Sequence, residues 1–310
     1  MTSWQNIAKT SAPTTQTAVS HLRSNPMNIG RVIVMLLRSV ILVGIVALLL
    51  LTFTISTTSL YQDIKAATGG DVEGLLPTYS GMSEAWQTHK TSLQDRHIPA
   101  TLWVTLSGLS IAMIVGLILA AIMDMVAWLR WILYPILVVS QTIPIFAIAV
   151  LLIILFGFNN GPKVIVVALF CFYPITINTL SGFRSVEPIH TNLLKTMGAN
   201  RLQIWWKVRL PTAMPAFFSG LRIAATYSVV GAVIGEYVGS GDGLGKFLQR
   251  SYRSFDIDQT YLTITIIAAL SVLLVLLTIL VEIVALRWRY IGMFRFSTRF
   301  TLFLRRFNKN

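Results

Sequence analysis

The sequence predicts an all-α membrane protein that crosses the bilayer six times, and three observations support this prediction. Of its 310 residues, 55% are hydrophobic and only 12% are charged, about half the charged fraction of an average soluble domain. Several apolar runs approach or exceed the roughly 20 residues that a helix needs to cross a bilayer. Lysine and arginine are also unevenly distributed between these runs. Because lipid cannot hydrogen-bond an exposed backbone, runs of this length fold as helices.

Six apolar runs are the predicted spans. They cover residues 39–59, 101–123, 131–156, 164–182, 216–238 and 260–285. The first begins too far from the N-terminus for the apolar segment of a cleavable signal, so we expect a retained anchor. The third contains Pro135 and Pro144. Because proline interrupts the hydrogen bonds of a helix, we expect a kink or a break in this span.

The basic residues predict the orientation of the chain. With the N-terminus inside, the inner segments are residues 1–38, 124–130, 183–215 and 286–310. They contain 17 lysines and arginines against two acidic residues, whereas the outer segments 60–100, 157–163 and 239–259 contain 7 against 8. This distribution follows the positive-inside rule. It places the tails 1–38 and 286–310 in the cytoplasm around a membrane domain 39–285, and it explains the net charge of +13 without a nucleic-acid partner.

Motifs that would carry catalysis are sparse. Cys171 lies in an apolar run and is most simply a small packed hydrophobe. His89 and His97 have no companions at the spacing of a metal site. The glycine-rich phosphate loop of an ATPase, with its Gly-Lys-Ser/Thr ending, does not occur in the sequence. We therefore expect no catalytic residue, no metal and no cofactor bound by this chain.

The inner loop 183–215 is too polar to span the membrane and too long for a simple connector. Residues 185–188 resemble a helix start with proline in the first turn. One face of the helix that follows is apolar: Ile189, Leu193, Leu194 and Met197. Gly198 is expected to end this helix, and Asn200 to cap a second one over 201–208 that stops at Leu210-Pro211. Such a pair could dock into a groove of a partner or lie on the lipid surface, and the physics alone favours neither.

A family resemblance favours docking. Gly198, nine residues, and then Val208-Arg209-Leu210-Pro211 resemble the signature loop of binding-protein-dependent ABC permeases, which reads Glu-Ala-Ala, three residues, Gly, nine residues, aliphatic, any residue, Leu-Pro. Further motifs, such as Gln-Thr-Ile-Pro at 141–144, resemble the nitrate, sulfonate, taurine and thiamine-pyrimidine branch: they lie at 156–158, 172–174, 178–179, 184–188, 219–224 and 243–245. The resemblance covers roughly residues 75–288. One departure is Asn192-Leu193-Leu194 in place of Glu-Ala-Ala, which removes the acidic side chain of the family.

The resemblance implies a type I ABC importer permease in a bacterial cytoplasmic membrane. The implied partners are a second permease copy, two ATPase subunits that hold ATP and magnesium, and an external substrate-binding protein. The motifs are most similar to permeases for pyrimidine precursors of thiamine, with alkylsulfonate, taurine or nitrate as alternatives. A competing class is an ion-coupled secondary transporter, which would show internal repeats and midplane charges. A membrane enzyme would need a catalytic cluster inside the spans; all four histidines lie outside them.

Two sets of functional residues follow. The resemblance implies that coupling to the ATPase involves Glu187, Asn192, Leu193, Leu194, Met197, Gly198, Ala199, Arg201, Leu210 and Pro211. Because polar groups in spans are costly and often functional, the candidates for the translocation path are Gln141, Thr142, Tyr173, Asn178, Tyr227 and Glu236. The alternative for such residues is hydrogen bonding between helices, and for Glu236 a structural or gating role. Arg222 is expected to snorkel to the inner interface, and Glu282 to lie at that interface.

Overall fold

The computed structural model describes residues 77–239 and 241–287, and within these residues all regular structure is helical. The elements of this part are α3 (Tyr79–Ser92), the wide turn η1 (Leu93–His97), α4 (Ile98–Met125), α5 (Ala127–Ser140), α6 (Ile145–Phe156), α7 (Asn160–Arg184), α8 (Pro188–Thr196), α9 (Arg201–Ile204), the wide turn η2 (Trp205–Arg209), α10 (Leu210–Val238), α11 (Leu244–Arg253) and α12 (Ile257–Ala285). The absence of strands here agrees with the predicted all-α class.

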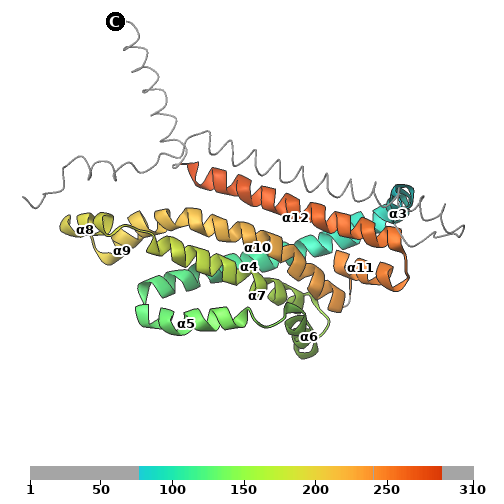
Figure 1. Ribbon diagram of the computed structural model, residues 1–310, viewed down its shortest axis with the longest axis horizontal. Coiled ribbons are helices and arrows are strands. Elements are labelled where there is room, and N and C mark those ends of the chain that lie inside the picture. The colour runs from blue at the N-terminus through green and yellow to red at the C-terminus, as the bar shows by residue number, and fades with distance from the viewer. Residues whose placement is uncertain (1–76, 240, 288–310) are drawn as a thin grey trace, which may run out of the picture. The chain divides into compact units, whose positions relative to one another are not determined.

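Four helices of the described part are long and apolar enough to cross a membrane, and a bent pair could make a fifth span. The predicted spans 101–123, 164–182, 216–238 and 260–285 fall within α4, α7, α10 and α12. The predicted span 39–59 lies outside the described residues. Figure 1 shows α8 and α9 at one end of the bundle and α11 at the other.

The predicted third span is broken, as its prolines indicated. Helix α5 ends at Ser140 and α6 begins at Ile145, and the two axes are bent by 94°. Pro144 is the residue at the N-terminal cap of α6, where its missing N–H costs nothing. Pro135 lies inside α5 without ending it. The break therefore comes from the short turn between the two helices and leaves each half too short to cross alone.

Helix α7 lies at the centre of the bundle, packed against α10 and α4 (Figure 1). Small residues allow these helices to approach closely: a Cβ at Gly220 of α10 would lie 2.6 Å from the carbonyl oxygen of Pro174 on α7. Cys171 is buried in the same contact, with its Sγ 3.3 Å from the carbonyl oxygen of Ala224. In membranes such close backbone contact supplies much of the packing energy between helices. Cys171 is thus a packed core residue, as predicted.

An ion pair joins α10 to α12. The Arg222 guanidinium binds the Glu282 carboxylate on the neighbouring helix, and Glu282 is only 8% exposed. Both residues were expected at the inner interface, Arg222 by snorkelling, and their pairing was not foreseen because the sequence does not reveal that they face each other. A paired charge is far less costly inside a membrane protein than an isolated one.

Candidate functional site

The segment 183–215, called the coupling loop, lies at one end of the bundle (Figure 1). It includes the last two residues of α7, then α8, α9 and η2, and the first residues of α10. Glu187 is the residue at the N-terminal cap of α8, and Pro188 occupies the first turn. The helix is followed by Gly198 at φ +80°, a left-handed conformation that glycine adopts without steric cost. These features confirm the predicted start and end of the helix.

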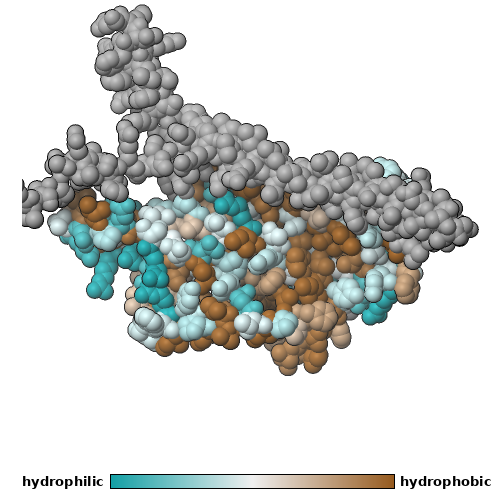
Figure 2. All heavy atoms as spheres, in the orientation of Figure 1, coloured by the Kyte–Doolittle hydropathy of each residue, from teal (hydrophilic) through white to brown (hydrophobic). Residues whose placement is uncertain are grey.

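The apolar face of α8 is exposed. Ile189 is 65% exposed, Leu193 60% and Met197 73%. In Figure 2 hydrophilic and hydrophobic residues lie side by side at this end of the bundle. Since exposing three large apolar side chains on one helix face gains nothing for the isolated chain, the face is suited to contact with a partner.

The second helix of the coupling loop differs in part from the prediction. The side-chain oxygen of Asn200 accepts from the backbone N–H of Gln203 at 2.8 Å, and the side-chain oxygen of Gln203 accepts from the backbone N–H of Asn200 at 2.9 Å. Asn200 was predicted as the cap, whereas Gln203 was missed. After Ile204 the helix widens through η2 and continues into α10, so Leu210-Pro211 does not end it. The wide turn can draw the earlier carbonyl away from the Pro211 ring, which relieves the usual clash.

Two contacts fix the coupling loop to the membrane helices. The Trp205 ring lies 5.7 Å from the Phe183 ring and packs against a core of α4, α5, α7 and α10 residues. The Arg209 guanidinium lies 2.6 Å from the Asp124 carboxylate at the end of α4. The Asp124 side chain is 4% exposed, so this ion pair is largely buried on the acidic side. Movement of the loop is therefore mechanically linked to α4.

The predicted coupling residues divide into a surface group and an anchoring group. The side chains of Asn192 and Arg201 are exposed with those of the α8 face, and Leu194 and Ala199 are half-buried. Leu210 and Pro211 are half-buried in the first turn of α10. Trp205, Arg209 and Asp124 were not among the predicted residues. Only Asp124, the single acidic residue of the short inner segment 124–130, offered a signal in the sequence.

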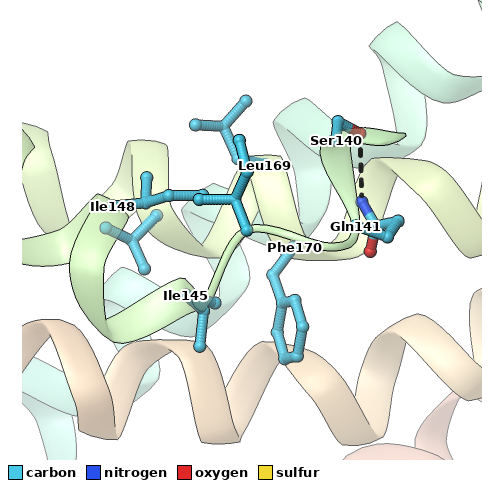
Figure 3. A pocket seen from close by; sticks show the side chains of 8 residues that line it. Ser140, Gln141, Ile145, Ile148, Leu169 and Phe170 are labelled. Carbon is cyan, nitrogen blue, oxygen red and sulfur yellow. Dashed lines mark hydrogen bonds between the residues drawn. The ribbon is translucent and has the colours of Figure 1, made fainter. Parts of the chain in front are cut away.

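Two of the predicted path residues lie at the bend between α5 and α6. Gln141 follows the last residue of α5 and donates to the Ser140 hydroxyl at 3.5 Å, while Thr142 is exposed. Beside them is a small hollow of about 30 Å³ (Figure 3). It is lined by Ser140, Gln141, Ile143, Ile145, Ile148, Val166, Leu169 and Phe170.

Helix α7 connects this small hollow to a larger one. The larger hollow has a volume of about 480 Å³, and its lining is Tyr134, Ile177, Leu180, Ser181, Arg184 and Ser185. Val166, Phe170, Ile177 and Arg184 follow at helical spacing, so both hollows lie along one face of α7. Tyr173 belongs to the same face and is half-buried. This face forms a stripe on which only uncharged residues lie between Lys163 and Arg184, which share its spacing.

Of the remaining path candidates, Tyr227 contacts this stripe and Asn178 and Glu236 make other contacts. The Asn178 side chain donates to the carbonyl oxygen of Pro174 at 2.8 Å, within its own helix. The Tyr227 ring on α10 stacks on Phe170, with 4.8 Å between the ring centres. Glu236 is wholly buried and accepts from the Thr101 hydroxyl at 2.9 Å. The structure therefore gathers Gln141 and Tyr173 along α7 but places Glu236 in a separate polar cluster.

Comparison with known proteins gives the family. The model of the family described as binding-protein-dependent transport system inner membrane component matches residues 112–290. The chain is 36% identical to the formylaminopyrimidine transport permease ThiX of Halalkalibacterium halodurans over 64% of this chain and 79% of that protein. It is 36% identical to the riboflavin transport system permease RibX of Chloroflexus aurantiacus, over 66% and 76%. It is also 29% identical to the taurine permease TauC of Escherichia coli, over 58% and 65%.

The fold agrees with a solved transporter. A chain of the MetNI methionine ABC transporter, in an inward-facing conformation, superposes with a TM-score of 0.53 at 21% identity, over 64% of this chain and 96% of that one. This likeness bears on the fold alone, which is that of a type I ABC importer permease. With the match over 112–290 and the coupling loop in its place, the chain belongs to the family of binding-protein-dependent ABC transporter inner membrane components.

Proposed function

We propose that this permease imports a pyrimidine precursor of thiamine, as part of an assembly with a second permease copy, two ATPase subunits and an external binding protein. Both termini lie in the cytoplasm in this proposal, as the basic residues indicate. ATP binding and hydrolysis by the partner ATPase alternately favour two orientations of the spans. This chain provides the path and receives the motion through its coupling loop.

The exposed apolar face of α8 supports the coupling role. Ile189, Leu193 and Met197 form a row at helical spacing, which suits insertion into a groove of a partner. The loop behind them is fixed to α4 through the Arg209–Asp124 ion pair. A displacement of α8 would therefore act on both α10, which continues from the loop, and α4.

The stripe along α7 supports the choice of substrate. Its polar groups include the Tyr134, Tyr173 and Ser181 hydroxyls and the Gln141 amide, and the lining of the two hollows contains only Arg184 as a charged residue. Neutral donors, acceptors and aromatic rings suit an uncharged heteroaromatic ring better than a small anion. Two relatives of 36% identity are named for formylaminopyrimidine and riboflavin, which are also nitrogen heterocycles.

The test is substrate-stimulated ATP hydrolysis and uptake in liposomes that contain the permease, its ATPase and its binding protein. Formylaminopyrimidine, taurine, an alkylsulfonate and nitrate are compared. We expect stimulation and uptake by formylaminopyrimidine only. Stimulation by taurine or a sulfonate instead would reject the pyrimidine but keep the importer, and ion-driven uptake without the ATPase would reject ATP coupling.

Gly198 and Gly157 provide a matched pair of variants for this assay. Their φ angles are +80° and +81°, and neither has an atom within 4 Å of an added Cβ. Valine is strained at both positions, on the order of 1–3 kcal/mol, and Gly157, whose ψ is −179°, lies in a region restricted almost entirely to glycine. We expect Gly198→Val to reduce stimulated uptake about tenfold or more, because it displaces α8, and Gly157→Val to retain most uptake. Equal losses would indicate a general folding defect rather than lost coupling.

A further inference from the structure

We propose that Glu236 is a positioning residue: its buried carboxyl group fixes the glycine-rich loop after α10, of which Gly239 and residues 241–243 are described, together with α11, and so holds in place the surface that receives the external binding protein. The loop and α11 lie at the end of the bundle opposite the coupling loop (Figure 1). We call this arrangement the clamp. It consists of the contacts that His97, Thr101, Lys163 and Glu236 make with the loop and the start of α11, all between described residues. Its purpose, to hold a docking surface, rests on the proposed function.

The carboxyl group of Glu236 joins three segments. Its Oε2 atom accepts from the Thr101 hydroxyl on α4 and from the backbone N–H of Gly245, both at 2.9 Å. The Thr101 hydroxyl oxygen also accepts from the N–H of Leu244 at 2.8 Å. The side chains of Thr101, Glu236 and Leu244 are buried, and so is Gly245. Hydrogen bonds in such a dry environment are strong, and their loss leaves costly unpaired groups.

A second contact holds the same loop from η1. The Nδ1 atom of the His97 ring lies 3.0 Å from the carbonyl oxygen of Gly243 and 3.1 Å from its backbone nitrogen, so it donates to the first or accepts from the second, according to its tautomer. Gly243 has φ +140° and lies directly over the Glu236 carboxyl group, so that an added Cβ would overlap that group. A Cβ on Gly245 would overlap the carbonyl oxygen of Val233. Because these glycines carry no Cβ, the backbone of the loop can pack closely against the end of α10.

Lys163 on α7 supports the other half of the loop. Its side chain is only 2% exposed, and a Cβ on Gly239 would lie 3.0 Å from its Cε atom. Side chains from η1, α4, α7 and α10 therefore converge on one loop.

The clamp determines the position of α11. This helix begins at Leu244, whose N–H is held by Thr101. Its apolar side chains Leu244 and Phe247 are buried against the bundle, whereas Arg250 and Tyr252 are exposed on the other side. Arginine and tyrosine are enriched where proteins dock. A surface held in place before docking avoids the entropy cost of ordering it on contact.

This role differs from lining the translocation path. Glu236 has no exposed surface, and within the described part of the chain its second oxygen, Oε1, has no hydrogen-bond partner. A path residue would change which solutes are carried when it is replaced. A positioning residue changes the mobility of α11 and the affinity for the binding protein, whatever the solute.

The first experiment measures the mobility of α11 without reference to transport. A nitroxide is attached at Arg250→Cys in a Cys171→Ala background of the full chain in nanodiscs, and its paramagnetic resonance spectrum is recorded. We expect a clear increase in mobility with Glu236→Leu, a smaller one with Thr101→Val, and little change with Glu236→Gln, whose amide oxygen can accept the same two hydrogen bonds. Asp242→Asn, an exposed carboxyl in the same loop, is the control.

The outcomes of this first experiment are distinct. Spectra of Glu236→Leu and Thr101→Val as immobile as the parent spectrum would overturn the clamp. If Glu236→Leu does not fold, Thr101→Val, which replaces one hydroxyl by a methyl group of similar size, decides the matter alone.

The second experiment measures ATP hydrolysis in the complete assembly against increasing concentrations of binding protein loaded with formylaminopyrimidine. We expect Glu236→Leu to raise the half-maximal concentration about tenfold and Glu236→Gln to raise it less than about threefold. A reduced maximal rate at an unchanged half-maximal concentration would overturn the positioning role. No stimulation of the unmodified assembly would instead reject the proposed function, and the mobility experiment would still decide the clamp.

Discussion

Trp205 shows at the scale of a single residue that packing, more than polar contact, holds the coupling loop. Its ring packs on Phe183, yet its indole N–H is buried and finds no acceptor among the described residues. Asn192 shows the opposite case: it replaces the acidic residue of the family pattern, and its side chain is exposed. Asn192 remains available to a partner, whereas Trp205 serves the fold.

Substitutions at Trp205 separate these contributions. We expect Trp205→Phe to change the free energy of unfolding by less than about 1 kcal/mol, because the lost contact area is offset by removing an unpaired N–H. Trp205→Ala should cost about 3 kcal/mol, since it leaves a cavity beside Phe183. Unfolding in mixed micelles with increasing SDS provides the measurement. Equal losses for both variants would mean that the indole N–H has a partner after all.

At the scale of elements, the coupling loop combines a fixed base with an exposed helix. Helix α9, η2 and α10 form one continuous helical stretch, tied to α4 by Arg209 and Asp124. Helix α8 projects from this base beyond Gly198, and its apolar face is uncovered. A rigid base transmits displacement and an exposed helix receives it, which is the arrangement that coupling requires.

A double-mutant cycle tests whether the Arg209–Asp124 ion pair attaches the coupling loop to α4. Arg209→Met leaves the nearly buried Asp124 carboxylate without its guanidinium, at a cost of about 2 kcal/mol, a reduced figure because Arg209 is itself partly exposed. The double variant with Asp124→Asn should regain at least half of that loss, because no charge remains buried. SDS unfolding of the four proteins gives the coupling energy. A value near zero would show that the ion pair does not join α4 to the loop.

The exposed helix is tested by a charge on its apolar face. We expect Leu193→Glu to abolish co-purification of the ATPase subunit while the permease itself remains folded, because Leu193 is 60% exposed. Lys195→Glu places the same side chain on the opposite face of α8 and should retain the ATPase. Loss of the ATPase in both variants would argue against a specific docking face and for a general charge effect.

At the scale of the whole molecule, the two ends of the bundle differ in construction. One end bears the coupling loop with exposed apolar side chains, and the other bears α11 clamped over buried polar groups (Figure 1). This difference between the ends suits the proposed transporter, in which one end contacts the ATPase and the other receives the binding protein. The basic residues predict which end faces the cytoplasm.

Labelling of intact cells tests this orientation. In a Cys171→Ala background, we expect a membrane-impermeant maleimide to label Asp242→Cys from outside and to leave Lys195→Cys unlabelled until the cells are opened. Both positions are exposed, so access to the reagent depends on the side of the membrane. The reverse pattern would invert the proposed topology and with it the assignment of the coupling loop to the cytoplasm.

The amino-acid sequence was enough to predict the class of fold, the spans that fall within α4, α7, α10 and α12, and the local features of the coupling loop. These depend on hydrophobic run length, on proline at a break and on the caps around Gly198 and Asn200, all of which are properties of neighbouring residues. The family motif around Gly198 and Leu210-Pro211 is local in the same sense, and it indicated the permease without knowledge of how the helices pack.

The contacts between distant polar groups could be identified only in the folded bundle. The pairs Arg209–Asp124 and Arg222–Glu282 join residues far apart in the chain, and Glu236 finds Thr101 and Gly245 across three segments. Helical periodicity specifies the face of a residue but not the partner opposite it, because that partner depends on how the helices pack. The stripe along α7 and the clamp on α11 could therefore be seen only once the bundle was assembled.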